Sequence, residues 1–233
     1  MTTIAANLQA VRERIAAACA AAGRPIADVA LLAVSKTWPA AAVSEAAAAG
    51  QYAFGESYVQ EAVAKIAVLG DLAARGVEWH FIGPLQSNKT RPVAENFAWV
   101  HSIERFKVAE RLSAQRPPGM PPLNVCLQVN VSGEASKSGC APEAAPELAR
   151  AVVQLPNLRL RGLMAIPEPT EDPTMARRRF ASLRELRDRL VAEGLPLDTL
   201  SMGMSHDLEA AIMEGATMVR VGTAIFGERV YST

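Results

Sequence analysis

The sequence predicts an α/β fold, namely a single-domain (β/α)8 barrel with an additional N-terminal helix. From residue 29 onward, short apolar runs alternate with alanine-rich segments of helical periodicity, which is the pattern of repeated βα units. The length of 233 residues also fits such a barrel, which typically has about 250 residues. A doubly wound open sheet is the alternative fold for the same alternation.

Eight strands are expected, each ending at a small or polar turn. They span residues 29–34, 52–54, 78–82, 98–101, 123–129, 158–163, 199–201 and 218–221. A helix over 3–22 precedes the first strand, so we expect it to pack outside the barrel or across its bottom. The clearest later helix begins at Pro173, after Asp172 as its N-cap, and continues to about residue 193. Pro39 and Pro142 are expected to open two further helices.

No segment has the composition of an interdomain linker, so residues 1–233 are expected to form one domain. Lys plus Arg and Asp plus Glu each number 24, a balance that gives no overall field to attract nucleic acid or an anionic membrane. No apolar run reaches membrane-spanning length, which leaves a small molecule as the expected partner. The three cysteines and the absence of a signal peptide favour free thiols and a cytoplasmic protein.

Lys36 is the first candidate for chemistry, because functional groups in this type of barrel gather at the C-terminal ends of the strands. It follows the apolar run 31–35, so its amine is expected to emerge in the mouth of the barrel, where a Schiff-base lysine belongs. A lone lysine at a strand end is more often a side chain that extends into solvent. Lys36 therefore needs support from other residues.

The last two predicted strands are followed by turns of small residues. SMGMSHD at 201–207 and RVGTAIFG at 220–227 each lead into a helix start, where free backbone amides can hold a phosphate. Loops after strands seven and eight are a common phosphate site in this barrel. Two adjacent loops of this kind favour a ligand that carries a phosphate.

The chain has three histidines, and no two of them have the close spacing of a helical or hairpin metal site. We therefore expect no metal. His80 and His101 each end a predicted strand, and we interpret them as structural histidines at the rim of the barrel.

Longer motifs carry a specific resemblance to a known family. They occur as AVSKT around Lys36, FGESYVQE at 54–61, WHFIGPLQSNK at 79–89, QVNVSGEASKSG at 128–139, GLMAIP at 162–167, SMGMSHD at 201–207 and MVRVGTAIFGER at 218–229. Over about four-fifths of its length the chain resembles the YggS-type pyridoxal phosphate homeostasis proteins, the PLPBP/PROSC family. The resemblance implies a barrel like the N-terminal domain of alanine racemase, which is fold type III among proteins that bind pyridoxal 5′-phosphate (PLP), without the second domain of that enzyme.

The same resemblance implies that PLP is the cofactor and that Lys36 holds it as a Schiff base. Ser205, Gly222 and Thr223 would hold the phosphate. Arg220 would face the pyridine nitrogen, where a permanent cation disfavours protonation of the ring and weakens the cofactor as an electron sink.

Four further residues carry over from the family with less direct roles. Asn130 and Met164 would line the ring of the cofactor, and Ser201 would lie beside the phosphate. Ser57 is a departure, because the family commonly has asparagine in this motif. Any hydrogen bond from that amide near the cofactor must be shortened, lost or bridged by water here.

The function implied is that of a binding protein in intracellular PLP homeostasis, with no catalytic turnover and with PLP-dependent apo-enzymes as recipients of the cofactor. One alternative is a PLP-dependent amino acid racemase that uses Lys36 as one of its bases. A more distant alternative is a cofactor-free aldolase, in which Lys36 attacks the carbonyl of a sugar phosphate. The racemase uses its second domain and its dimer to complete each site. Without that domain, a monomer is expected here.

Overall fold

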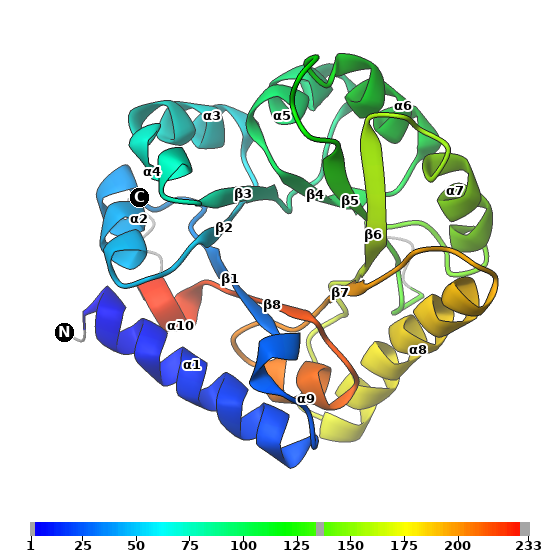
Figure 1. The fold of residues 1–233 in the computed structure, drawn as a ribbon. Coiled ribbons are helices and arrows are strands. Elements are labelled where there is room, and N and C mark those ends of the chain that lie inside the picture. The colour runs from blue at the N-terminus through cyan, green and yellow to red at the C-terminus, as the bar shows by residue number, and fades with distance from the viewer. Residues whose placement is uncertain (1–2, 134–137, 229–233) are drawn as a thin grey trace, which may run out of the picture.

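The computed structural model describes residues 3–133 and 138–228, and its centre is a closed barrel of eight parallel strands in sequential order (Figure 1). Closure is made by pairing of the first strand with the eighth, which excludes the open-sheet alternative. The predicted barrel is confirmed. Its strands are β1 (Ala30–Val34), β2 (Ala53–Glu56), β3 (Glu78–Phe81), β4 (Trp99–Ile103), β5 (Leu123–Gln128), β6 (Leu158–Met164), β7 (Thr199–Ser201) and β8 (Met218–Val221).

Helices surround the barrel on its outer side (Figure 1). They are α1 (Ile4–Ala21), α2 (Ala40–Ala48), α3 (Val59–Val68), α4 (Asp71–Ala74), α5 (Thr90–Asn96), α6 (Phe106–Gln115), α7 (Ala145–Val152), α8 (Pro173–Ala192), α9 (Leu208–Met213) and α10 (Thr223–Phe226), with short 3-10 turns at η1 (Ile26–Asp28) and η2 (Ser87–Lys89). In the described ranges no helix is long and apolar enough to cross a membrane.

The predicted helix starts are only partly confirmed. The Asp172 side chain accepts a hydrogen bond from the Thr174 amide and so caps α8 as expected. Pro39 directly precedes α2 and serves as its N-cap residue. The prediction that a helix begins at Pro142 is wrong, because residues 142–144 form a turn and α7 begins only at Ala145.

Three strands extend beyond their predicted ends; β6 continues by one residue, to Met164, and β2 and β4 by two residues each. β2 was expected over 52–54, but Gly55 and Glu56 also pair, with His80 and Phe81 of β3. β4 likewise continues past residue 101 to Ile103. In both cases a polar or small residue continues the strand because a neighbouring strand supplies the pairing, which the local composition does not reveal.

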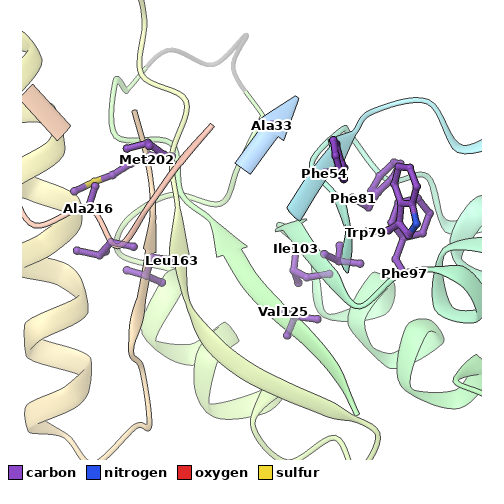
Figure 2. Packing of buried hydrophobic residues seen from close by; sticks show 14 of the residues in the cluster. Ala33, Phe54, Trp79, Phe81, Phe97, Ile103, Val125, Leu163, Met202 and Ala216 are labelled. Atoms are coloured by element: carbon purple, nitrogen blue, oxygen red, sulfur yellow. The ribbon is translucent and has the colours of Figure 1, made fainter. Parts of the chain in front are cut away.

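The core between barrel and helices is apolar and rich in aromatic rings (Figure 2). Phe54 packs against Trp79 with ring centroids 5.7 Å apart, and Phe81 meets Phe97 edge-on at 5.5 Å. Successive side chains of a strand point to opposite faces, so His80, between Trp79 and Phe81, points into the barrel. The interior of the barrel thus receives polar side chains while the outer layer supplies the hydrophobic core.

Candidate functional site

A cavity of about 190 Å³ opens at the C-terminal end of the barrel, the end at which this architecture places its chemistry. Six of the nine residues predicted for the site line it. The full lining consists of Val34, Lys36, Ser57, Ile82, Ile166, Met204, Ser205, His206, Arg220, Gly222 and Thr223. Residues that follow six different strands therefore meet at one cavity.

Lys36 lies in a strained turn directly after β1. The next residue, Thr37, has a φ of 69°, a left-handed conformation that is a genuine outlier for a β-branched residue. Its amide donates to Glu61 Oε1 at 2.6 Å, which helps to hold the turn. The strain fixes the direction in which the chain leaves β1 and so places Lys36 at the cavity.

A buried ion pair holds the residue on the other side of Lys36. Lys65 Nζ lies 2.6 Å from Glu56 Oε1 and also donates to the Ser35 carbonyl at 2.9 Å, while the Ser35 hydroxyl donates to the same Glu56 oxygen at 2.6 Å. The side chains of Lys65 and Glu56 are 5% and 0% exposed. Burial raises the pKa of Glu56, and the hydrogen bonds and charge of Lys65 oppose that rise. Lys65 also pairs with Glu61 at 3.0 Å, so one network fixes both neighbours of Lys36.

Arg220 is buried beneath the cavity, with 3% of its surface exposed. It donates to the Ser201 carbonyl at 2.5 Å, to the Ser201 hydroxyl at 2.8 Å and to the Ala165 carbonyl at 2.8 Å. Burial lowers its pKa to about 10, so the guanidinium remains a cation at neutral pH. Three acceptors on two strand ends hold that cation in one orientation.

A hydrogen-bonded chain continues from Arg220 through the interior of the barrel. The Ser201 hydroxyl lies 2.7 Å from His101 Nδ1, and His101 Nε2 lies 2.9 Å from His80 Nδ1. Both histidines are buried in the interior, so their predicted place at the rim was wrong. Because Arg220 donates to the Ser201 oxygen, the hydroxyl proton is left to His101, whose Nε2 then donates to His80. This order leaves the proton of His80 on Nε2, which has no hydrogen-bond partner among the described residues.

The two histidines should make the protein less stable in mild acid. Burial lowers the pKa of His80 to about 3, and burial, His80 and Arg220 hold the pKa of His101 well below its usual value. Below about pH 6.5 both histidines become protonated in the unfolded chain but stay neutral in the folded protein. The free energy of unfolding therefore falls by roughly 1.4 kcal/mol per histidine for each pH unit.

Urea unfolding at pH 7, 6 and 5 measures this slope. His80→Gln should make the profile shallower, because it removes one of the two buried histidines that stay neutral in the folded protein. A profile that is flat from pH 7 to pH 5 would contradict the neutral state of the pair.

The loops after β7 and β8 present main-chain amides to the cavity. Within the described residues, the amides of His206, Gly222 and Thr223 donate to no acceptor. Gly222 lies so close to β1 that an added Cβ would come within 3.1 Å of the Val34 carbonyl, which explains why a small residue stands there. Unpaired amides and a close-packed glycine are the features with which loops of this kind bind phosphate.

The remaining predicted residues lie at different distances from the cavity. Ser57 lines it, and its loop leaves no room for a side chain at Gly83, where a Cβ would come within 2.3 Å of the Ser57 carbonyl. Ser201 does not line the cavity, but its hydroxyl accepts a hydrogen bond from Arg220, which does. Asn130 and Met164 are outside the lining; the Asn130 amide bonds to the Cys140 carbonyl, and Met164 is fully buried in the barrel interior. Residues 134–137 of the motif at 128–139, and Arg229 of the last motif, lie outside the described residues.

A larger hollow, of about 590 Å³, opens at the opposite end of the barrel. Two of its cations already have partners: Arg161 forms a forked pair with Asp198, and Arg24 donates to the Ile212 carbonyl. Among the described residues no group of three or more His, Cys, Asp or Glu side chains is placed to hold a metal ion. The smaller cavity beside Lys36 is therefore the candidate site, although it is not the most spacious one.

Sequence reasoning missed the groups that act on the site from a distance. Lys65 lies on an amphipathic helix, where a lysine is normally interpreted as solvent-exposed. The pairing of His80 with His101 has a detectable signal, because strand alternation points both side chains into the barrel. His206, which lines the cavity beside Ser205, was part of a recognised motif but had been assigned no role.

Comparison with known proteins identifies the family of this chain. Residues 6–230 match the family model described as alanine racemase, N-terminal domain. The pyridoxal phosphate homeostasis protein of Pseudomonas aeruginosa is 67% identical over 231 residues, which cover 99% of this chain and 98% of that protein. The protein of the same name from Escherichia coli K12 is 54% identical over 236 residues, covering 100% and 99%.

A solved structure extends the comparison to three dimensions. The structure of PipY from Synechococcus elongatus with PLP bound has a TM-score of 0.84 and 39% sequence identity, and the match covers 97% of this chain and 100% of that one. The chain therefore belongs to the alanine racemase N-terminal domain family and, within it, to the YggS-type pyridoxal phosphate homeostasis proteins.

Proposed function

We propose that this protein binds PLP in the cavity beside Lys36 and serves in PLP homeostasis. The observation that carries the proposal is the meeting of three features in one cavity: a lysine at the end of β1, a buried arginine and two loops with unpaired amides. The names of the relatives and the PLP bound by PipY support the same ligand.

The charge of the cavity fits an anionic ligand that carries a phosphate. Arg220 is a buried cation that forms no ion pair with a carboxylate in the described part of the chain; its partners are two carbonyls and a hydroxyl. Burial of a charge without an ion-pair partner is costly, and the charge of Asp207 offsets only part of the effect of burial on Arg220. An anion in the cavity is therefore stabilised there. Unpaired amides at His206, Gly222 and Thr223 supply donors that do not depend on protonation.

The residues divide into two ends of the site. Lys36 would hold the aldehyde end of the cofactor, and Ser205, Gly222 and Thr223 would hold its phosphate. When bound, PLP supplies an aldehyde that condenses with an amine and a ring that accepts electrons. Arg220 would face the ring nitrogen.

The other predicted contacts have supporting roles in this proposal. Asn130 and Met164 would flank the ring from the ends of β5 and β6, and Ser57 would contact the cofactor only weakly. Ser201 would act through Arg220, since its hydroxyl and its carbonyl both accept from that guanidinium.

Arg220 makes the site better suited to holding the cofactor than to deep carbanion chemistry. Its pKa near 10 keeps it charged, and its three acceptors prevent it from turning away. A fixed cation beside the ring nitrogen disfavours a proton there, and the unprotonated ring is a weaker electron sink. We propose that the protein stores or hands on PLP and is not an enzyme.

The delivery role is part of the same proposal. PLP-dependent apo-enzymes would be the recipients, in the cytoplasm, and the protein would act as a monomer. The cavity is open at the barrel mouth, and exposed Tyr58 and Ile166 lie near it, so bound cofactor would remain accessible.

The protein loaded with PLP should not racemise L-alanine at an enzymatic rate, which is typically above about 1 per second. Racemisation needs two acid or base groups on opposite faces of the substrate carbon. Among the described residues that line the cavity, the titratable side chains are Lys36, His206 and Arg220. Arg220 is fixed by hydrogen bonds and His206 follows Ser205 in the phosphate loop, which leaves Lys36 alone at the aldehyde end.

The assay incubates excess L-alanine with the loaded protein and resolves the enantiomers by chiral chromatography. Free PLP and the Lys36→Ala variant serve as controls. Steady formation of D-alanine that needs Lys36 would overturn the storage role and favour the racemase.

A further inference from the structure

The N-terminal helix α1 reaches the main chain of the site from outside the barrel. It runs beside α9 and α10, the helices that follow β7 and β8 (Figure 1). Leu8, Val11 and Ile15 form its buried face. Just beyond the helix, Arg24 donates to the Ile212 carbonyl at the end of α9.

Two polar side chains of α1 bind carbonyls in the segments that carry the phosphate loops. Arg14 Nη2 donates to the Ser205 carbonyl at 3.0 Å, and Asn7 Nδ2 donates to the Ile225 carbonyl in α10 at 2.8 Å. These residues are seven apart, which is two helical turns, so they lie on one side of α1. The helix thus holds one carbonyl in each of the two segments.

The bond from Arg14 determines where the next amide points. In a trans peptide group the carbonyl and the following N–H point in opposite directions, and no cis peptide occurs in the described residues. Arg14 draws the Ser205 carbonyl outward to α1, so the His206 N–H points inward. Ser205 and His206 line the cavity, and this N–H has no acceptor within the described part of the chain.

We propose that Arg14 and Asn7 are positioning residues for phosphate binding, and that α1 acts as a brace which holds the loops after β7 and β8 in their binding conformation. The inference rests on the proposed function and adds to it the source of the loops' preorganisation. Preorganised donors strengthen binding because the ligand does not have to order them.

The surface ion pair of Arg14 does not account for this role. Arg14 also pairs with Glu209 at 2.9 Å, but the two side chains are 38% and 49% exposed, and pairs of that kind contribute little. Glu209→Gln removes the ion pair and leaves the bond to the Ser205 carbonyl, so it separates the two contributions.

Arg12 provides a matched control on the same helix. It donates to the Ala49 carbonyl at 3.2 Å and to the Gly50 carbonyl at 2.9 Å, which belong to the connection between α2 and β2. Arg12→Met therefore removes the same kind of bond without touching either phosphate loop.

The experiment titrates each purified variant with PLP and with pyridoxal, which lacks the phosphate, and follows the change in visible absorbance. The ratio of the dissociation constant for pyridoxal to that for PLP measures what the phosphate contributes to binding. Arg14→Met should lower that ratio by about tenfold or more, because the His206 N–H is no longer held in the direction of the charged phosphate. The affinity for pyridoxal should stay unchanged. Asn7→Leu should lower the ratio in the same direction, whereas Arg12→Met and Glu209→Gln should preserve it.

A ratio unchanged in Arg14→Met and Asn7→Leu, or lowered equally in Arg12→Met, would show that α1 is only a packing element. If Arg14→Met does not fold, Arg14→Lys replaces it, since an ammonium keeps the charge but lacks the fork that reaches Ser205 and Glu209 together. Its ratio should again fall, and an unchanged ratio would reject the brace. Should the unaltered protein bind pyridoxal as tightly as PLP, the phosphate site itself is wrong, which is a different failure from that of the brace.

Discussion

Replacing Lys36 with alanine should abolish covalent capture of PLP completely while leaving the barrel folded. Lys36 is half-buried at the cavity, so its loss removes an amine and a flexible stem without opening the hydrophobic core. The free energy of unfolding should change by less than about 1 kcal/mol. The phosphate loops remain, so PLP should still bind, more weakly and without covalent attachment.

The measurement is the intact mass after incubation with PLP and borohydride, together with the visible spectrum. Lys89→Ala, at a half-buried lysine outside the cavity, is the control and should retain full labelling. Undiminished labelling of Lys36→Ala would show that another lysine holds the cofactor.

Replacing Lys65 with methionine should cost about 3–5 kcal/mol of folding free energy, the penalty for leaving a buried charge without its partner. Glu56 is fully buried, and Lys65 is its ion-pair partner at 2.6 Å. Because burial already raises the pKa of Glu56 above 4.5, the missing cation raises it further. The folded state then favours the protonated acid, so the penalty should be largest at neutral pH and shrink as the pH falls towards 4.5.

Urea unfolding at pH 7 and pH 5 measures both effects. Lys107→Met, at an exposed lysine of α6, is the matched control and should change the stability by no more than about 0.5 kcal/mol. The double variant Glu56→Gln, Lys65→Met should recover part of the loss, because it removes the stranded charge. A single variant as stable as the control would mean that the pair contributes nothing to the turn that carries Lys36.

The fold was predictable because barrel strands are short, apolar and regularly spaced. The ranges 199–201 and 218–221 match β7 and β8. The failures have local causes: Gly55 and Glu56 extend β2 because β3 pairs with them, and the turn after Pro142 delays α7. Neither pairing nor a turn before a helix is encoded in composition alone.

The cavity lining was predictable for the residues that sit at strand ends in recognisable motifs, such as Lys36, Arg220 and Thr223. The groups that hold these residues were not. Lys65 is 29 positions from Lys36, and Arg14 bonds to a carbonyl 191 positions away. Such contacts arise only when the barrel closes and brings α1 against α9, so no local pattern announces them.

The central claim, that Lys36 holds PLP, is tested most directly by mapping the attachment site in the unaltered protein. The protein is loaded with PLP, reduced with borohydride, digested and analysed by peptide mass spectrometry. We predict a single labelled peptide that contains Lys36, together with a visible absorption band before reduction. A label on Lys89 or on Lys137, which lies outside the described residues, or the absence of both band and label, would contradict the claim.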